Sequence, residues 1–182
     1  MANAAWDLFL TIPDREKHIQ DLIQCNVLSV PMMCSLILPQ MVERKKGLIV
    51  NLASTAALLP TPCMVVYAAT KAFVHKFSQD LSMEYSNKGI VIQSVLPGPV
   101  ATPLIRMDKG NLVAPKADTY VESAIKTIES ASSTTGYFIH TLMISSSRLM
   151  IFLCPWLYKK IVLFRNFSER DRVIKQGYYK NN

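Results

Sequence analysis

Two short apolar runs, at residues 47–53 and 90–96, constrain the fold of this 182-residue chain more than any other feature. Each run is rich in aliphatic and β-branched residues and is bounded by Gly, Ser or Pro, which is typical of a strand that is buried on both faces of a parallel sheet. Segments with helical period precede and separate the two runs. Strands that alternate with helices predict βαβ units with right-handed crossovers, and therefore an α/β fold.

The first helical segment carries an asparagine on its apolar face. Asn26 completes the spacing i, i+3, i+4, i+7 that begins at Ile19, so it stands where an apolar residue is expected. Pro31 follows soon after and must break or kink the helix unless it lies in a first turn, because proline has no N–H to donate. We therefore expect Asn26 to lie close to a helix irregularity with unpaired backbone groups.

Two further helices and a third strand are expected later in the chain. Residues 64–87 have helical period, and Lys88 and Gly89 then supply a basic last turn and a glycine stop. Thr119 and Glu122 have the spacing of a capping box, which predicts a helix from there to about residue 130. Residues 135–140 are the third strand candidate.

Composition and charge exclude several classes of protein. Half of the residues are hydrophobic and only six are glycine, which excludes a disordered or collagen-like chain. Most of the net charge of +7 lies from residue 148 onward, where eight basic and two acidic residues give +6. This pattern predicts a basic tail and no nucleic-acid partner. The four cysteines contain no C-x-x-C pair and the three histidines are isolated, so neither a disulfide framework nor a metal site is indicated.

The apolar run at residues 149–158 is too short to span a bilayer by itself. It has ten residues before Lys159 and Lys160, whereas a spanning helix needs about 20. Two interpretations suit it: a packed C-terminal helix, or an amphipathic segment that lies on a membrane with its basic residues at the headgroups.

Three polar residues are expected to meet at one end of the sheet. Tyr67 and Lys71 are four residues apart in the long helix, so their side chains share one face. Ser54 follows the first strand, and ligands of parallel α/β sheets bind outside the carboxyl ends of strands. A phenol, an ammonium and a hydroxyl in one crevice suit carbonyl reduction: Tyr67 donates a proton to the developing alkoxide, Lys71 lowers the pKa of the phenol, and Ser54 orients the oxygen.

Three motifs resemble the signature of the short-chain dehydrogenase/reductase family: Asn-Leu-Ala-Ser at 51–54, Tyr-Ala-Ala-Thr-Lys at 67–71, and Pro-Gly-Pro-Val-Ala-Thr at 97–102. The resemblance implies that Tyr67 is the catalytic acid, that Lys71 is its partner and a ligand of the cofactor ribose, and that Ser54 anchors the carbonyl. It also implies that the helix kink at Asn26 holds a proton-relay water. The alternative for Asn26 is an ordinary kink or cap asparagine.

The same resemblance assigns the loop after the second strand to the cofactor. Pro97, Val100 and Thr102 would lie at the nicotinamide, with Val100 and Thr102 binding its carboxamide. Tyr67 and Lys71 would complete the cofactor contacts.

Further motifs are similar to the branch of 17β-hydroxysteroid dehydrogenases and very-long-chain 3-oxoacyl-CoA reductases. They include Met-Val-Glu-Arg at 41–44, Ser-Val-Leu-Pro at 94–97 and Gly-Tyr-Phe-Ile-His at 136–140. That branch implies NADP(H) as cofactor, a lipophilic ketone as substrate (a ketosteroid or a long-chain 3-oxoacyl-CoA), and a membrane-associated protein of the endoplasmic reticulum. Family dimers imply a homodimer through helices at 22–43 and 66–88.

The sequence departs from the family in one respect. The family's first half carries a strand and a glycine-rich turn at a helix N-terminus that holds the cofactor pyrophosphate, and the glycines here form no such cluster. We therefore expect a partial Rossmann-type parallel sheet with flanking helices, without the N-terminal strands and the glycine-rich turn. Residues 1–147 would be the C-terminal part of a dinucleotide-binding reductase domain, and residues 148–182 a basic, apolar extension. Two functions follow: an NADPH-dependent ketone reductase, or a truncated, non-catalytic chain that binds full-length subunits or membranes.

Overall fold

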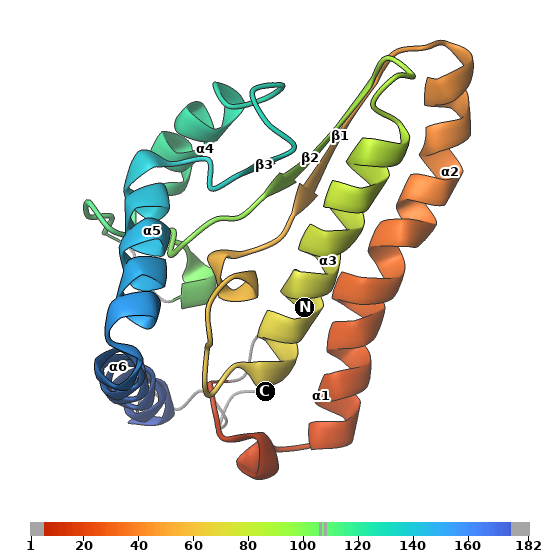
Figure 1. The fold of residues 1–182 in the computed structure, drawn as a ribbon. Coiled ribbons are helices and arrows are strands. Elements are labelled where there is room, and N and C mark those ends of the chain that lie inside the picture. Colours follow the sequence, from red (N-terminus) through yellow and green to blue (C-terminus); the bar gives the residue numbers. More distant parts are fainter. Residues whose placement is uncertain (1–5, 106, 108, 176–182) are drawn as a thin grey trace.

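The computed structural model describes residues 6–105, 107 and 109–175. Its centre is a parallel sheet with the order β1 (Gly47–Leu52), β2 (Ile90–Val95), β3 (Ser133–Thr134). β1 and β2 pair in register from Gly47 opposite Ile90 to Leu52 opposite Val95, and β2 continues to β3 through Ser94 and Val95. Figure 1 shows the strands between helices on either side, so the predicted α/β fold with a partial parallel sheet is confirmed.

Helices surround the sheet in the order expected of βαβ units. The described elements are η1 (Phe9–Thr11), α1 (Arg15–Leu22), the π-helix η2 (Ile23–Leu28), α2 (Ser29–Glu43), η3 (Thr55–Ala57), α3 (Val65–Glu84), η4 (Pro103–Ile105), α4 (Ala117–Ile125), α5 (Phe138–Leu153) and α6 (Pro155–Lys175).

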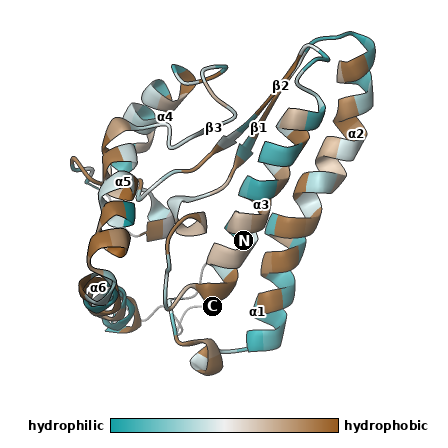
Figure 2. Cartoon of the chain, viewed as in Figure 1, coloured by the Kyte–Doolittle hydropathy of each residue, from teal (hydrophilic) through white to brown (hydrophobic). Residues whose placement is uncertain are grey.

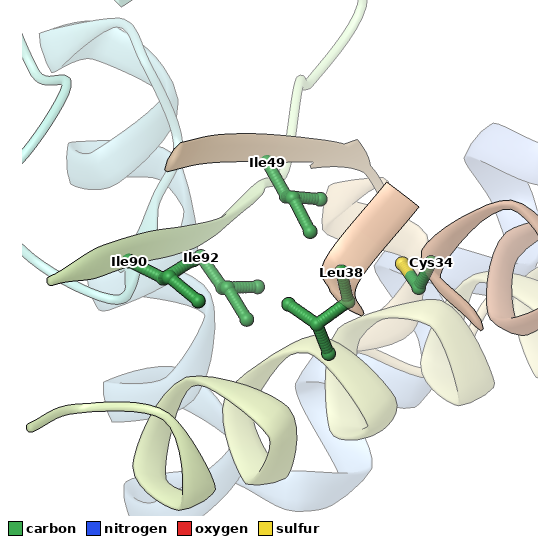
Figure 3. Close-up of a cluster of buried hydrophobic side chains, with 5 residues drawn as sticks. All are labelled: Cys34, Leu38, Ile49, Ile90 and Ile92. Carbon is green, nitrogen blue, oxygen red and sulfur yellow. The ribbon is translucent and has the colours of Figure 1, made fainter. Parts of the chain in front are cut away.

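The main core lies between one face of the sheet and the helices α2 and α3. Ile49, Ile90 and Ile92 point from the strands toward Cys34 and Leu38 of α2 (Figure 3). These five side chains are at most 7% exposed. Because side chains alternate across a strand, the isoleucines at 90 and 92 share the face that Ile49 occupies in the parallel neighbour.

The opposite face of β1 is not covered by the described residues. Leu48, Val50 and Leu52 are 43%, 41% and 61% exposed. The prediction that this strand is buried on both faces is therefore wrong for β1, although it holds for β2, where four consecutive residues from Ile92 to Val95 are buried. The reason is position: β1 pairs only with β2 in the described part of the chain, so it is an edge strand, whereas β2 is central.

Two other expectations need correction. The third strand is Ser133–Thr134 and not residues 135–140, because Gly136 turns the chain at a φ of 70° and α5 then begins at Phe138. The capping box does not open α4, which begins at Ala117 with Lys116 as its N-cap, so Thr119 lies inside the helix. A backbone bridge between Ala101 and Lys116 fixes the chain there before the helix starts.

The C-terminal part consists of two helices that meet at residue 154. The apolar run at 149–158 is divided between α5 and α6, because Cys154 leaves helical geometry and Pro155 starts α6. α5 is continuous across residues 147 and 148. An ion pair connects α6 to the segment before η1, because Arg170 Nε lies 2.6 Å from Asp7 Oδ1.

Candidate active site

The carboxyl ends of β1 and β2 form the floor of the site. Ser54 follows β1 and caps η3, where its Oγ accepts a hydrogen bond from the Ala56 N–H at 3.2 Å. The carbonyl of Pro97, which follows β2, accepts the Thr55 N–H at 2.9 Å and lies 3.5 Å from Ser54 Oγ. The parallel register therefore brings Ser54 and the loop after β2 to the same edge of the sheet.

The first turns of α3 bring Tyr67 and Lys71 to this edge. The Lys71 Nζ donates to the carbonyl of Leu52, the last residue of β1, at 2.9 Å. It lies 5.8 Å from the centre of the Tyr67 ring. The structure thus places the serine, the tyrosine and the lysine around one strand end, as the spacing of the motifs predicts.

Burial changes the acidity of both groups. The pKa of Tyr67 is raised by burial, and the Ser54 hydroxyl acts in the opposite direction by hydrogen bonding to the phenol. The pKa of Lys71 is lowered by burial, against a smaller opposing influence of Cys25. A phenol with a raised pKa keeps its proton at neutral pH and can deliver it to an oxygen that becomes basic during a reaction.

Asn26 lies in the π-helix η2, between α1 and α2. The Ser29 N–H bonds to the carbonyl of Gln24, five residues earlier, and Pro31 then falls in the first turn of α2. The expected irregularity is therefore a π-helical turn, a form that is frequent at functional sites. The Asn26 amide nitrogen points out of this turn and donates to Thr70 Oγ1 at 3.1 Å.

Thr70 is a site residue that the sequence analysis missed. Its hydroxyl donates to the carbonyl of Tyr67 at 2.8 Å while it accepts from Asn26, so it joins the π-helix to the backbone of the tyrosine. Its side chain is buried, at 4% exposure. A signal was present: Thr70, Val74 and Ser78 follow one another at intervals of four and form the buried stripe of α3, and a hydroxyl on such a stripe requires a partner.

The loop after β2 is held close to the segment that precedes α4. The Ala101 N–H donates to the Pro115 carbonyl at 2.9 Å, and Thr102 Oγ1 donates to the Val100 carbonyl at 3.2 Å. Pro97, Val100 and Thr102 therefore lie on the same side of the sheet as Ser54, at the carboxyl end of β2.

The comparisons with known proteins agree with this geometry. The family model "short chain dehydrogenase" matches residues 2–111. Very-long-chain 3-oxoacyl-CoA reductases from Mus musculus and Homo sapiens are 48% and 46% identical over 170 residues, which cover 93% of this chain and 54% of each relative. The chain therefore spans about half the length of the curated relatives that it matches.

Solved structures show the same fold. A short-chain dehydrogenase from Sphingobium yanoikuyae in complex with NADPH has a TM-score of 0.65 at 25% identity, over 82% of this chain and 61% of that one. A bulky-bulky ketone specific alcohol dehydrogenase from Comamonas testosteroni has a TM-score of 0.61 at 23% identity, over 83% of this chain and 60% of that one.

The chain belongs to the short-chain dehydrogenase family, a family of oxidoreductases that use nicotinamide cofactors. Within it, the chain is a member of the branch that contains the very-long-chain 3-oxoacyl-CoA reductases.

The described residues fit one end of such a cofactor. The Lys71 ammonium has two N–H groups besides the one that it donates to the Leu52 carbonyl, and the Thr102 hydroxyl, which donates to the Val100 carbonyl, can still accept. A nicotinamide and its ribose need hydrogen-bond partners of this kind. Among the described residues, no cluster of glycines stands at a helix N-terminus to bind a pyrophosphate. The fit is therefore to the nicotinamide end alone.

Proposed function

We propose that this chain carries the catalytic residues of an NADPH-dependent reductase of long-chain 3-oxoacyl-CoA. The observation that carries the proposal is the grouping of Ser54, Tyr67 and Lys71 at the end of β1. The identity of 48% to the mouse very-long-chain 3-oxoacyl-CoA reductase supports the acyl-CoA substrate over a ketosteroid.

Each site residue has a step that suits its chemistry. The Ser54 hydroxyl holds the ketone oxygen, and the Tyr67 phenol gives that oxygen its proton as the carbonyl carbon is reduced. A bound NADPH would supply the hydride. The Lys71 ammonium stabilises the phenolate that is left, because the attraction between opposite charges is strong in a site that is shielded from water.

Asn26 and Thr70 position the acid Tyr67, and the π-helical turn that holds Asn26 helps to return the proton that Tyr67 gives away. The π-helical turn of η2 leaves backbone carbonyls free of their usual partners, and we propose that a water bound there returns a proton toward Lys71 and Tyr67. The hydrogen bonds from Asn26 to Thr70 and from Thr70 to the Tyr67 carbonyl keep this turn against α3.

The substrate class is tested with a completed chain, a chimera in which this chain follows the N-terminal segment of the mouse relative. Oxidation of NADPH is followed by absorbance with a long-chain 3-oxoacyl-CoA or a 17-ketosteroid as substrate. We expect a higher kcat/KM for the acyl-CoA. A higher kcat/KM for the steroid would overturn the substrate class, and no oxidation with either ketone would overturn the proposed activity.

We also propose that the protein binds a membrane surface, that of the endoplasmic reticulum. Apolar residues are exposed along α5 and at its junction with α6. The end of α5 next to α6 is brown, the colour of hydrophobic residues, in Figure 2. Phe152, Trp156 and Phe164 are 83%, 63% and 78% exposed. Lys159 and Lys160 lie beside them, with the Lys160 Nζ 5.2 Å from the centre of the Trp156 ring. This combination suits peripheral binding to an anionic bilayer.

Membrane association is tested by flotation with lipid vesicles. We expect binding to vesicles that contain phosphatidylserine, and loss of binding in the double variant Phe152→Ser, Trp156→Ser. Met83→Ser on α3 is a matched control, since Met83 is 76% exposed and lies on another helix. Alkaline carbonate should release the protein from cell membranes, whereas full retention would contradict a peripheral mode.

One helical run of the described residues has the length of a membrane span. The helical run Arg15–Glu43 is long and apolar enough to cross a membrane by length and composition. Its inner face is occupied, however, because Cys34 and Leu38 pack on the sheet and Asn26 bonds to α3. We therefore assign this run to the fold of the domain.

The outer face of the same run supports a homodimer. Met32, Met33 and Leu36 of α2 are 54%, 56% and 67% exposed, and an apolar helix face of this kind suits pairing with a second copy. Light scattering of the completed chain should give twice the monomer mass, and Met33→Glu should halve it. A monomeric wild-type protein would contradict the proposal.

A further inference from the structure

A buried histidine holds the loop that follows β2. His140 of α5 has no exposed surface. Its Nδ1 accepts the Gly98 N–H at 3.1 Å, and its Nε2 lies 3.2 Å from the Pro99 carbonyl and 3.1 Å from the Val113 carbonyl. One imidazole thus makes contacts with three backbone groups, two of which belong to the loop at residues 97–102.

The partners define the protonation state of this ring. Nδ1 faces an N–H and must offer a lone pair, whereas Nε2 faces two carbonyls and must carry the hydrogen. The neutral Nε2–H tautomer satisfies both sides, and its assignment follows from the hydrogen-bond network. A proton on Nδ1 would face the Gly98 N–H and break the first bond.

The contact is tight and specific for the loop. A β-carbon at Gly98 would lie 2.7 Å from the His140 ring, so the backbone can rest on the imidazole only where the residue is glycine. The rings of Tyr120 and Tyr137 enclose His140 with centroids 5.8 Å and 5.1 Å away. The imidazole therefore cannot turn away from the loop without disturbing two aromatic neighbours.

The loop in question is the one that would meet the nicotinamide. Gly98 and Pro99 stand directly between Pro97, whose carbonyl contacts Ser54 and Thr55, and Val100, whose carbonyl binds Thr102. A shift of the two central residues would move both ends of the loop relative to Tyr67. A buried histidine with only a packing role would not need bonds to two consecutive residues of this segment.

We propose that His140 is a positioning residue. Its neutral ring holds Gly98 and Pro99 against α5 through hydrogen bonds, here called the crosslink, and so sets Val100 and Thr102 at the nicotinamide end of the site. This inference rests on the cofactor site proposed above. It concerns the arrangement of the loop, because His140 itself is covered by the loop and by two tyrosines.

Two variants of the completed chain, whose new side chains are isosteric with each other, test the crosslink. His140→Asn keeps a side-chain oxygen that can accept the Gly98 N–H, whereas His140→Leu has the same shape without an acceptor. Hydrogen exchange resolved by mass spectrometry suits the loop, because the prolines at 97 and 99 leave few amides in this peptide. We expect exchange of the Gly98 amide to rise about tenfold in His140→Leu, the effect of about 1.4 kcal/mol for one lost hydrogen bond, and to stay within about threefold of wild type in His140→Asn.

Millimolar NADPH separates the inference from the proposed function. NADPH should slow exchange at residues 100–102 in the wild type and in His140→Asn, and much less in His140→Leu. Equal protection by NADPH in all three proteins would overturn the inference while the cofactor site stands. No protection in the wild type would overturn the cofactor site and the inference with it. If His140→Leu unfolds, failure of His140→Asn to protect Gly98 would still overturn the crosslink.

Discussion

Tyr67 is the residue on which the proposed chemistry depends most directly. In the completed chain, Tyr67→Phe should abolish reduction of the ketone, because it removes the acidic proton and almost no volume. The free energy of unfolding should change by less than about 1.5 kcal/mol, as for other isosteric substitutions. Initial rates of NADPH oxidation and urea unfolding measure the two quantities. Near-normal turnover in the folded variant would mean that another group supplies the proton.

Lys71 has two proposed roles, and these can be separated. Lys71→Met keeps the length of the side chain but removes the ammonium that donates to the Leu52 carbonyl. We expect turnover to fall by about 100-fold, as for loss of an electrostatic contact in a transition state, together with weaker NADPH binding. Titration of fluorescence measures the cofactor affinity of the completed chain. Unchanged affinity would confine Lys71 to the chemical step.

His140 should also make the stability of the fold depend on pH. Burial lowers the pKa of His140 below its usual value of 6.5, against the opposing influence of the Val113 and Pro99 carbonyls. As the pH falls through 6.5, His140 takes up a proton in the unfolded chain but stays neutral in the folded chain. The free energy of unfolding therefore decreases, by at most about 1.4 kcal/mol per pH unit for one group. Below the pKa of His140 in the folded chain both states carry the proton, and the free energy of unfolding no longer depends on pH through this group.

The slope is measured by urea unfolding between pH 7 and pH 5. Tyr120 and Tyr137 are the titratable groups whose rings contact His140, and burial raises the pKa of Tyr120 far above this range. His18 and His75 have lowered pKa values as well, for which burial is again the largest cause. The comparison is therefore between wild type and His140→Asn, and an identical slope in both would show that His140 titrates as freely in the folded chain as in the unfolded one.

At the scale of elements, the sequence predicted the strands and the long helix of the site well. β1, β2 and α3 could be found because their periodicity is strong and Gly or Pro marks their ends. The grouping of Ser54, Tyr67 and Lys71 followed from the rule that sites lie at strand ends. The π-helix could be expected only as an irregularity, since the sequence does not reveal that Asn26 bonds to Thr70, 44 residues later.

Other elements depended on contacts between distant residues. The run at 135–140 has the residue types of a strand, yet Gly136 turns the chain and α5 begins at Phe138. The buried His140 of that helix then binds Gly98, 42 residues earlier. The start of α4 is fixed by the bridge from Lys116 to Ala101 and not by the local capping box. Local patterns carry no information about such partners.

The attachment of α6 to the N-terminal segment should contribute strongly to stability. The Arg170 Nε lies 2.6 Å from Asp7 Oδ1, and the Asp7 side chain is 6% exposed. Burial by itself would raise the pKa of Asp7, but hydrogen bonds from Arg170, Thr11 and the Leu8 N–H outweigh it and leave the pKa lowered. The carboxylate therefore stabilises the fold above its unfolded pKa of 3.8, and this contribution is lost as the pH falls through the lower folded pKa.

Arg170→Met would leave that carboxylate buried without its cation. We expect the free energy of unfolding to fall by about 3 kcal/mol, the lower end of the range for a broken buried pair, because Thr11 and Leu8 still donate. Arg172→Met on the same helix is the control. Arg172 is exposed and its partner Glu169 is partly exposed, so the change should be about 0.5 kcal/mol. Equal effects of the two substitutions in urea unfolding would contradict a buried role for Arg170.

At the scale of the whole molecule, the open face and free edge of β1 limit what the chain can do alone. Leu48, Val50 and Leu52 expose apolar surface, and no described strand pairs with the outer edge of β1. Such an edge is a template for pairing with another chain. It supports the alternative function, in which the chain binds full-length subunits without catalysis.

The most direct measurement of the central claim compares the chain alone with the completed chain in one assay. NADPH oxidation is followed with a long-chain 3-oxoacyl-CoA, and NADPH binding is measured on both proteins by isothermal titration with light scattering. The completed chain should bind NADPH and turn over through Tyr67 and Lys71. The 182-residue chain should do neither, since its described part has no glycine cluster at a helix N-terminus to bind the pyrophosphate. It should self-associate through the free edge of β1. A folded, NADPH-bound completed chain that leaves the ketone unreduced, or micromolar NADPH binding by a monomer of the chain alone, would contradict the account.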